Sequence, residues 1–241
     1  AITFLASCGD VSRRSPLDSV AEIRDFSRND TQSSARVKLR AVVTCVDRNM
    51  RLLVVQDQTG GIRVGFPENG GDLSAGQLVE VTGEVAPGIV PAIAQAVVRV
   101  VGTGTMPAAE QVSMDRLRSG KYEYRRIELR GVVHAAQMEW TGRAGMVMMV
   151  EGQSVKVRVF GYPGAVWKQM VDTEVRVAGV LSAGSDAKPE EDRVRLWVAG
   201  LSDVTVERPP TAPAELPVRT VAEFKKSPEL RQSQHRMRFH G

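Results

Sequence analysis

The sequence predicts an all-β protein of two tandem small five-stranded barrels, each preceded by a short helix, followed by the truncated start of a third unit. Three observations support this fold class. A helix-start pattern occurs three times, a strand with alternating apolar and charged residues follows it each time, and the later strands of the first two units recur in the same order. Such repetition indicates that one structural unit is used several times.

Each predicted helix begins with a hydroxyl residue that can cap exposed backbone amides. In the first and third helices Glu follows three residues later, which is the spacing of a capping box. Apolar residues within each helix are available for docking on a barrel. The helices are predicted at Ser19–Phe26, at Ser113–Arg118 and in a third copy that starts with Thr220–Phe224.

The strand after each helix alternates apolar and charged residues, as in Arg36–Val43 and Arg126–Val133. Strict alternation predicts one buried and one exposed face. The third copy is Arg236–Gly241, which covers only part of that strand. We therefore expect residues 218–241 to be poorly ordered or to rest on a neighbouring unit.

Four further strands are predicted in each unit. Gly60 and Gly61 allow the positive φ of a hairpin turn, and Gly83 and Gly179 mark corresponding corners inside strands. A helical turn is predicted within Tyr162–Met170. The strands are Leu52–Asp57, Ile62–Phe66, Gln77–Val85 and Ala96–Val101 in the first unit, and Met146–Glu151, Val155–Phe160, Thr173–Leu181 and Val194–Ala199 in the second.

Five short strands in about 70–80 residues, with a glycine inside a strand and a helix at one end, are typical of a small closed barrel such as the OB-fold. A pair of SH3-like barrels or a small β-sandwich is the alternative. We expect a signal remnant or disordered lead at 1–15, helix and barrel at 16–104 and again at 105–206, a proline-rich linker at 207–217 and the third repeat at 218–241.

Several of these segments carry a family resemblance, namely Ser19–Ile23, Val37–Thr44, Leu52–Val64, Leu73–Gly83 and Leu216–Arg219. They resemble the tandem OB-like repeats in the extracytoplasmic sensory region of bacterial sensor histidine kinases and related signalling proteins. The resemblance implies a non-enzymatic binding or sensory module, a fragment of a signal-transduction receptor, whose partner is an unidentified small ligand or protein. It supplies no functional residue that can be carried over to this chain.

The segment Leu5–Cys8 resembles a bacterial lipobox, in which the cysteine is lipidated. It predicts export, an extracytoplasmic location in the periplasm or cell envelope, and membrane attachment only through a lipid on Cys8 or through flanking segments. Without such a signal the location would be cytoplasmic. Cys45 is expected to be a small buried hydrophobe, and a disulfide with Cys8 is the alternative in an oxidising compartment.

The 32 basic and 28 acidic residues give a net charge of +4, and the excess lies mainly after residue 206. Single-stranded nucleic acid requires aromatic and basic side chains on one face, and the first unit offers only Phe66 between residues 36 and 104. Nucleic acid is therefore a disfavoured partner, kept as an alternative function beside an envelope lipoprotein acting as a structural or adaptor module. The predicted ligand groove lies in the second unit and is lined by Trp140, Arg143, Arg158, Tyr162 and Trp167.

The sequence predicts no enzyme, with no catalytic residue, metal site or cofactor. His134 has no serine or cysteine at a suitable spacing. Met146 and Met148, which alternate on one strand, are expected in the core rather than on copper. The segment Asp57–Gly61 is expected to be a hairpin turn in which Asp57 bonds nearby backbone, rather than a cradle for an anion.

Overall fold

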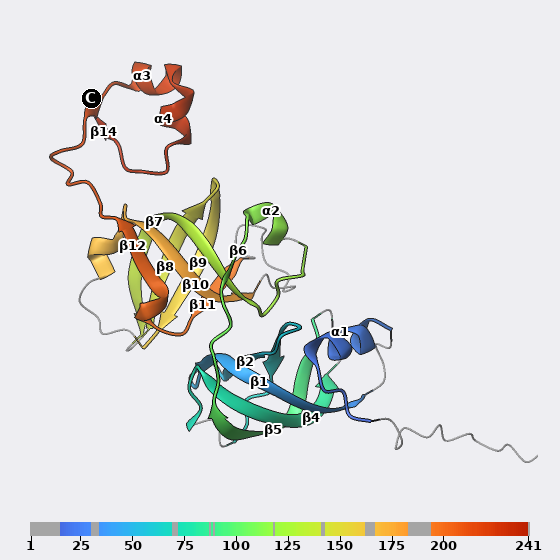
Figure 1. The fold of residues 1–241 in the computed structure, drawn as a ribbon. Coiled ribbons are helices and arrows are strands. Elements are labelled where there is room, and N and C mark those ends of the chain that lie inside the picture. Colours follow the sequence, from blue (N-terminus) through green and yellow to red (C-terminus); the bar gives the residue numbers. More distant parts are fainter. Residues whose placement is uncertain are drawn as a thin grey trace, which may run out of the picture.

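A computed structural model describes residues 15–29, 34–68, 72–86, 88, 90–117, 119–140, 143–161, 167–182 and 194–240. It confirms the predicted all-β fold class of small OB-like barrels. Figure 1 shows two barrels that follow one another along the chain and a small C-terminal segment beyond the second.

The first barrel closes in the order β1-β2-β3-β5-β4, with β4 paired back to β1. All neighbours are antiparallel except β3 and β5, which run parallel. The helix α1 precedes the barrel. The elements are α1 (Val20–Asn29), β1 (Arg36–Asp47), β2 (Leu52–Gln56), β3 (Gly61–Val64), β4 (Gln77–Ala86) and β5 (Ala92–Thr103).

The second barrel repeats this topology, because β7, β8, β9, β11 and β10 form a circuit in which β10 pairs back to β7. The counterpart of β5 is interrupted, so that β11 and β12 pair with different parts of β10. The elements are β6 (Glu110–Gln111), α2 (Met114–Leu117), β7 (Arg126–Trp140), β8 (Arg143–Val150), β9 (Gln153–Phe160), the 3-10 helix η3 (Trp167–Met170), β10 (Glu174–Ser182), β11 (Arg195–Val198), the 3-10 helix η5 (Leu201–Asp203) and β12 (Val204–Arg208).

All three units open with the same motif, in which the residues before the helix pair in parallel with the strand after it. Leu17 pairs with Val37 in the first unit, β6 pairs with β7 in the second, and β13 pairs with β14 in the third. The third unit contains β13 (Val218–Arg219), α3 (Val221–Lys226), α4 (Pro228–Gln232) and β14 (Arg238–Phe239). The repeat inferred from sequence is therefore a repeat of structure.

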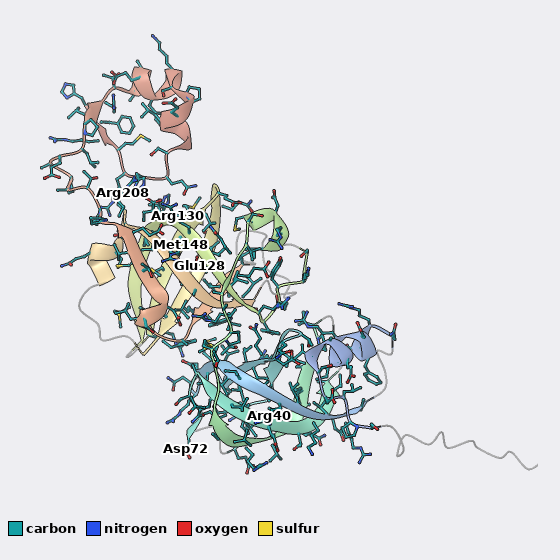
Figure 2. The ribbon with its side chains drawn as sticks, in the orientation of Figure 1. Arg40, Asp72, Glu128, Arg130, Met148 and Arg208 are labelled. Atoms are coloured by element: carbon teal, nitrogen blue, oxygen red, sulfur yellow. The ribbon has the colours of Figure 1, made fainter. Side chains whose placement is uncertain are left out.

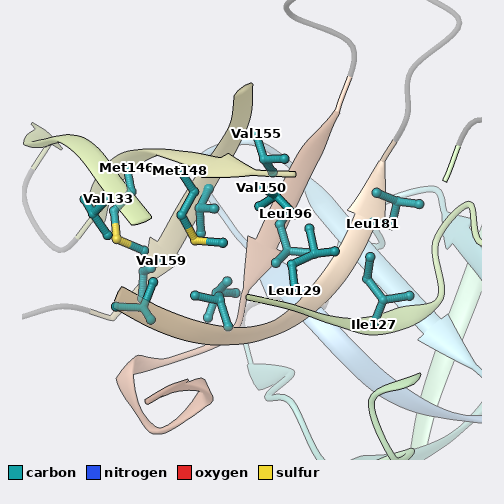
Figure 3. Close-up of a cluster of buried hydrophobic side chains, with 14 of the residues drawn as sticks. Ile127, Leu129, Val133, Met146, Met148, Val150, Val155, Val159, Leu181 and Leu196 are labelled. Atoms are coloured by element: carbon teal, nitrogen blue, oxygen red, sulfur yellow. The ribbon is translucent and has the colours of Figure 1, made fainter. Parts of the chain in front are cut away.

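Each barrel has its own core, and its helix contributes to that core. Val20 and Ile23 of α1 are buried with the inner side chains of the first barrel, and Met114 and Leu117 of α2 with those of the second. Met146 and Met148 lie inside the second barrel among valines and leucines (Figure 3), which confirms their prediction as core residues.

Most predicted strands agree with the observed ones within a few residues. The strand predicted at Arg126–Val133 shows the largest difference, because β7 continues to Trp140, and the fifth strand of the first unit also differs. That fifth strand is predicted at 96–101 but begins at Ala92, because Ala92 and Ile93 pair with β3 before the strand turns at Gln95, whose φ is 49°. In the second unit the predicted turn within Tyr162–Met170 is present as η3, and residues 162–166 lie outside the described part.

Candidate functional site

An apolar cluster joins the outer surfaces of the two barrels. From the first barrel it includes Cys45, Leu52 and Val54, and from the second Phe160, Val180 and Trp197, with Met50 and Tyr124 packed against them. A β-bulge between Val43 and Cys45 allows this arrangement, because the extra residue turns Cys45 away from the barrel core. Both faces of β2 are thus buried, one in the core of its own barrel and one against the second barrel.

A buried ion pair crosses this interface. The Arg143 guanidinium of β8 donates from Nη2 to both carboxylate oxygens of Asp47 at the end of β1, at 2.7 and 2.8 Å. The two side chains are only 9% and 10% exposed. The same guanidinium lies 5.5 Å from the centre of the Phe160 ring, which stacks on Trp197 with centroids 5.9 Å apart. A charge pair this deeply buried tolerates little movement, because separation would leave each charge without its partner.

Close backbone contacts add to the interface. A Cβ atom on Gly61 would lie 1.7 Å from the Tyr124 carbonyl oxygen, so only glycine fits there. The Arg126 amide donates to Gln56 Oε1 at 2.8 Å. Arg24 of α1 donates to the carbonyls of Gly61 (2.9 Å) and Glu123 (2.6 Å) and thereby bridges the two units. Burial lowers the pKa of this guanidinium, and Glu123 partly offsets that effect.

Two of the five residues predicted to line a groove have described side chains. Arg143 lies in the interface, and Arg158 of β9 lies beside it with its guanidinium 5.3 Å from the Trp197 ring centre. The side chains of Trp140, Tyr162 and Trp167 lie outside the described part of the structure. Sequence reasoning missed Asp47, because its partner is 96 residues away.

Cys45 is a free buried thiol, as predicted. Burial raises the pKa of this thiol well above its usual range, and the nearby Asp47 carboxylate adds to the effect. The prediction that Cys8 is lipidated falls on a residue outside the described ranges.

The Asp57 turn follows the hairpin prediction. Asp57 Oδ1 accepts from the amides of Thr59 and Gly60, both at 2.8 Å. Its other oxygen accepts from the Val20 amide of α1, so both carboxylate oxygens are used within the protein.

Charges on the outer surface of the second barrel are largely paired with one another. Arg130 contacts Glu174 at 3.0 Å and Glu207 at 2.6 Å, and Arg208 contacts Glu174 at 3.7 Å. Figure 2 labels Arg130 and Arg208 on this surface, together with Glu128, which contacts Arg176 at 3.5 Å. We infer a solvated, self-compensated surface there.

The first barrel has a shallow depression of about 380 Å³ between β1 and β4. Its lining carries both signs of charge and includes polar groups of Arg36, Lys38, Thr82, Glu84 and Gln95. No group of three or more potential metal-ligating side chains occurs among the described residues. Within those same residues, no helix is long and apolar enough to cross a membrane.

Comparison with known proteins gives no matching family model and no curated relative. Among solved structures, an asparaginyl-tRNA synthetase from Entamoeba histolytica matches 52% of this chain at 15% identity with a TM-score of 0.35. The chain spans 28% of that synthetase. A murine DNA-binding protein bound to double-stranded DNA matches 72% of this chain and 99% of its own, at 13% identity and a TM-score of 0.33. The tetrameric p202 HIN2 domain matches 80% of this chain and 99% of its own, at 14% identity and a TM-score of 0.31.

Proposed function

We propose that this chain is a non-catalytic binding module in which two OB-like barrels act as one rigid body. The observation that carries the proposal is the buried Asp47–Arg143 pair, set beside an apolar cluster contributed by both barrels. Rigid coupling means that a partner held by one barrel is also oriented relative to the other.

The partner surface that we propose lies on the second barrel. In OB-folds the face formed by strands 2 and 3 is the usual binding face. On the first barrel, Leu52 and Val54 of this face are buried against the second barrel. The first barrel therefore uses this face to bind the surface of the second barrel.

The corresponding face of the second barrel is partly open. Val147 and Met149 of β8 and Lys156 of β9 are half-buried there. By strand register Val147 corresponds to Val54, because Val147 pairs with Ala135 across the same β-bulge at which Val54 pairs with Cys45. By analogy with the first barrel, we propose that this face also binds a protein surface.

Rigid coupling can be measured by ¹⁵N relaxation of the whole chain. One rotational correlation time for amides of both barrels supports the proposal, and two clearly different times contradict it. In the Asp47→Asn variant, which lacks the charge that faces Arg143, the correlation times of the two barrels should differ more than in the unaltered chain. The Glu80→Gln variant is the matched control, since Glu80 lies on the surface and pairs with Arg99 within the first barrel.

Single-stranded nucleic acid is the second candidate partner. Lys156 and Arg195 are direct neighbours on the parallel strands β9 and β11, and Arg158 lies over the Trp197 ring two positions along. The basic side chains are the cationic element of a single-strand binding surface, whereas the Trp197 ring is only 5% exposed and packs in the apolar cluster between the barrels.

A fluorescence titration with a labelled oligothymidylate at 50 and 200 mM salt separates the two candidates. Sub-micromolar binding that weakens steeply with salt would support nucleic acid. The Lys156→Ala/Arg195→Ala variant should then reduce the slope of log affinity against log salt by about 1.4, whereas Arg99→Ala on the first barrel should leave it unchanged. Absence of binding at both salt concentrations would favour the protein partner.

On the resemblance of Leu5–Cys8 to a lipobox, we further propose an extracytoplasmic location with a lipid on Cys8. The test is incorporation of labelled palmitate into the chain expressed in bacteria behind the charged and apolar regions of an export signal. Incorporation that is lost in Cys8→Ser supports the proposal, and equal labelling of both proteins contradicts it.

A further inference from the structure

Residues Gln234–Arg236, which lead into β14, lie against the second barrel. His134 Nε2 is 2.6 Å from the Gln234 carbonyl oxygen. In the amide orientation that its neighbours require, the Gln234 side chain donates to the Met149 carbonyl (3.0 Å) and accepts from the Gly152 amide (2.9 Å). The segment is thus held by contacts from β7 and from the turn between β8 and β9. Figure 1 shows the C-terminal segment beyond the end of the second barrel where β7 and β12 are labelled.

Asp172 forms the other half of this contact. Its Oδ1 atom accepts from the Arg236 amide at 2.8 Å and lies 3.1 Å from His235 Nδ1. The Asp172 side chain is only 3% exposed. A buried carboxylate needs hydrogen-bond donors to offset its lost hydration, and here the third segment provides them.

The backbone at Asp172 adds an independent observation. Asp172 has a φ of 72°, in the left-handed region that is unfavourable for residues other than glycine. The first barrel has Gly76 at the corresponding turn, with a φ of 89°. The Asp172 amide donates to Val133 at 2.7 Å, as the Gly76 amide donates to Val43 at 2.8 Å. The second barrel therefore carries a carboxylate where the first uses the residue best suited to the turn.

His134 differs from its counterpart in a similar way. It is the extra residue of the bulge in β7, and Thr44 has the same place in β1. The Thr44 hydroxyl is buried and donates to Val54 within its own barrel, whereas His134 is exposed and contacts the third segment. Both departures from the first unit occur at positions that contact residues 234–236.

We propose that the second barrel has a recognition site for an extended segment, formed by His134, Asp172 and the β8–β9 turn. Its ligand is a segment of three residues. The first has a glutamine side chain, the second has an N–H group on its ring or side chain, and the third has a backbone amide that is free to donate to Asp172. In this chain the ligand is Gln234–Arg236, and the site orients the third unit on the second barrel. The assignment is independent of the function proposed above.

The Asp172→Gly variant tests the site directly. Glycine is the residue that the first barrel has at this turn, so the free energy of unfolding of the barrel should stay the same or rise. The variant removes the acceptor for the Arg236 amide. Hydrogen exchange of that amide should become at least about tenfold faster, because a bond to a charged acceptor is lost. Exchange of the Gly76 amide in the first barrel should be unchanged.

Unchanged exchange at Arg236 in Asp172→Gly would overturn the proposal. If glycine instead lowers the stability of the barrel, Gln234→Ala decides, because this position belongs to the bound segment and lies outside both barrel cores. Faster exchange at Arg236 in Gln234→Ala supports the site, and wild-type exchange refutes it.

Discussion

The Asp57 carboxylate accepts a hydrogen bond from the Val20 amide at 2.9 Å, so the first hairpin turn caps a helix that begins 37 residues earlier. The second unit repeats this contact, because Glu151 accepts from the Met114 amide at 3.0 Å across the same separation of 37 residues. An acidic side chain at the amino end of a helix satisfies a free amide and interacts favourably with the helix dipole. The turn between strands 2 and 3 thereby positions each docking helix.

Removal of either cap should loosen the helix on its barrel. We expect Asp57→Ala and Glu151→Ala to lower the free energy of unfolding by about 1–2 kcal/mol. Asp57→Ala should have the larger effect, because Asp57 also holds Thr59 and Gly60. Urea unfolding measures the change. Asp25→Ala on the exposed side of α1 is the control and should cost less than about 0.5 kcal/mol.

Because Asp47 and Arg143 form a buried pair across the interface, the effects of replacing them on the free energy of unfolding should be strongly non-additive. Asp47→Leu or Arg143→Met alone should cost about 3–5 kcal/mol, because each leaves an unpaired buried group. The double variant Asp47→Leu/Arg143→Met should recover most of that loss, since apolar replacements suit the surrounding cluster. Equilibrium unfolding of the four proteins gives the coupling free energy. Additive single effects would mean that the pair is not coupled across the barrels.

A side chain at position 61 should push the two barrels apart. Gly61→Ala places a methyl group against the Tyr124 carbonyl, so the barrels must move apart while the first barrel retains its own core. We expect a longer maximum dimension by small-angle X-ray scattering and little change in far-ultraviolet circular dichroism. Gly88→Ala is the control, because its nearest contact is at an ordinary 3.6 Å. An unchanged scattering profile for Gly61→Ala would count against the contact.

The reactivity of the Cys45 thiol reports whether the interface is closed. Because burial and Asp47 raise the pKa of its thiol, the thiol stays protonated well above the pH at which a free cysteine ionises. In a Cys8→Ser background, the native protein should therefore react slowly with a disulfide reagent, with little increase from pH 7 to pH 9. Gly61→Ala should accelerate the reaction. Rapid labelling of the unaltered interface would contradict its burial.

The sequence was sufficient for the repeated fold, because alternation and helix caps are local patterns. Arg36–Val43 shows its buried face by alternation alone, and Ser19 with Glu22 indicates a helix start. The contacts between units could not be read in this way. Asp47 and Arg143 are ordinary surface residues by type, and only the docking of two barrels makes them a buried pair. Asp172 is equally inconspicuous until its turn is compared with that of Gly76.

Equivalent positions of the second and third units should contribute unequally to the free energy of unfolding. By the repeat, Leu129 and Phe239 occupy the same place in the strand after the helix, but Leu129 is 1% exposed in the second core and Phe239 is 44% exposed. Leu129→Ala should lower the free energy of unfolding of the second barrel by about 2–5 kcal/mol, because it removes a buried side chain and leaves a cavity. Phe239→Ala should cost less than about 1 kcal/mol, since its described ring contact is the edge-on approach to Phe224. Thermal unfolding of both variants measures the contrast. A similar loss in the two would mean that Phe239 is buried in solution, either by a partner or by a different packing of the third unit.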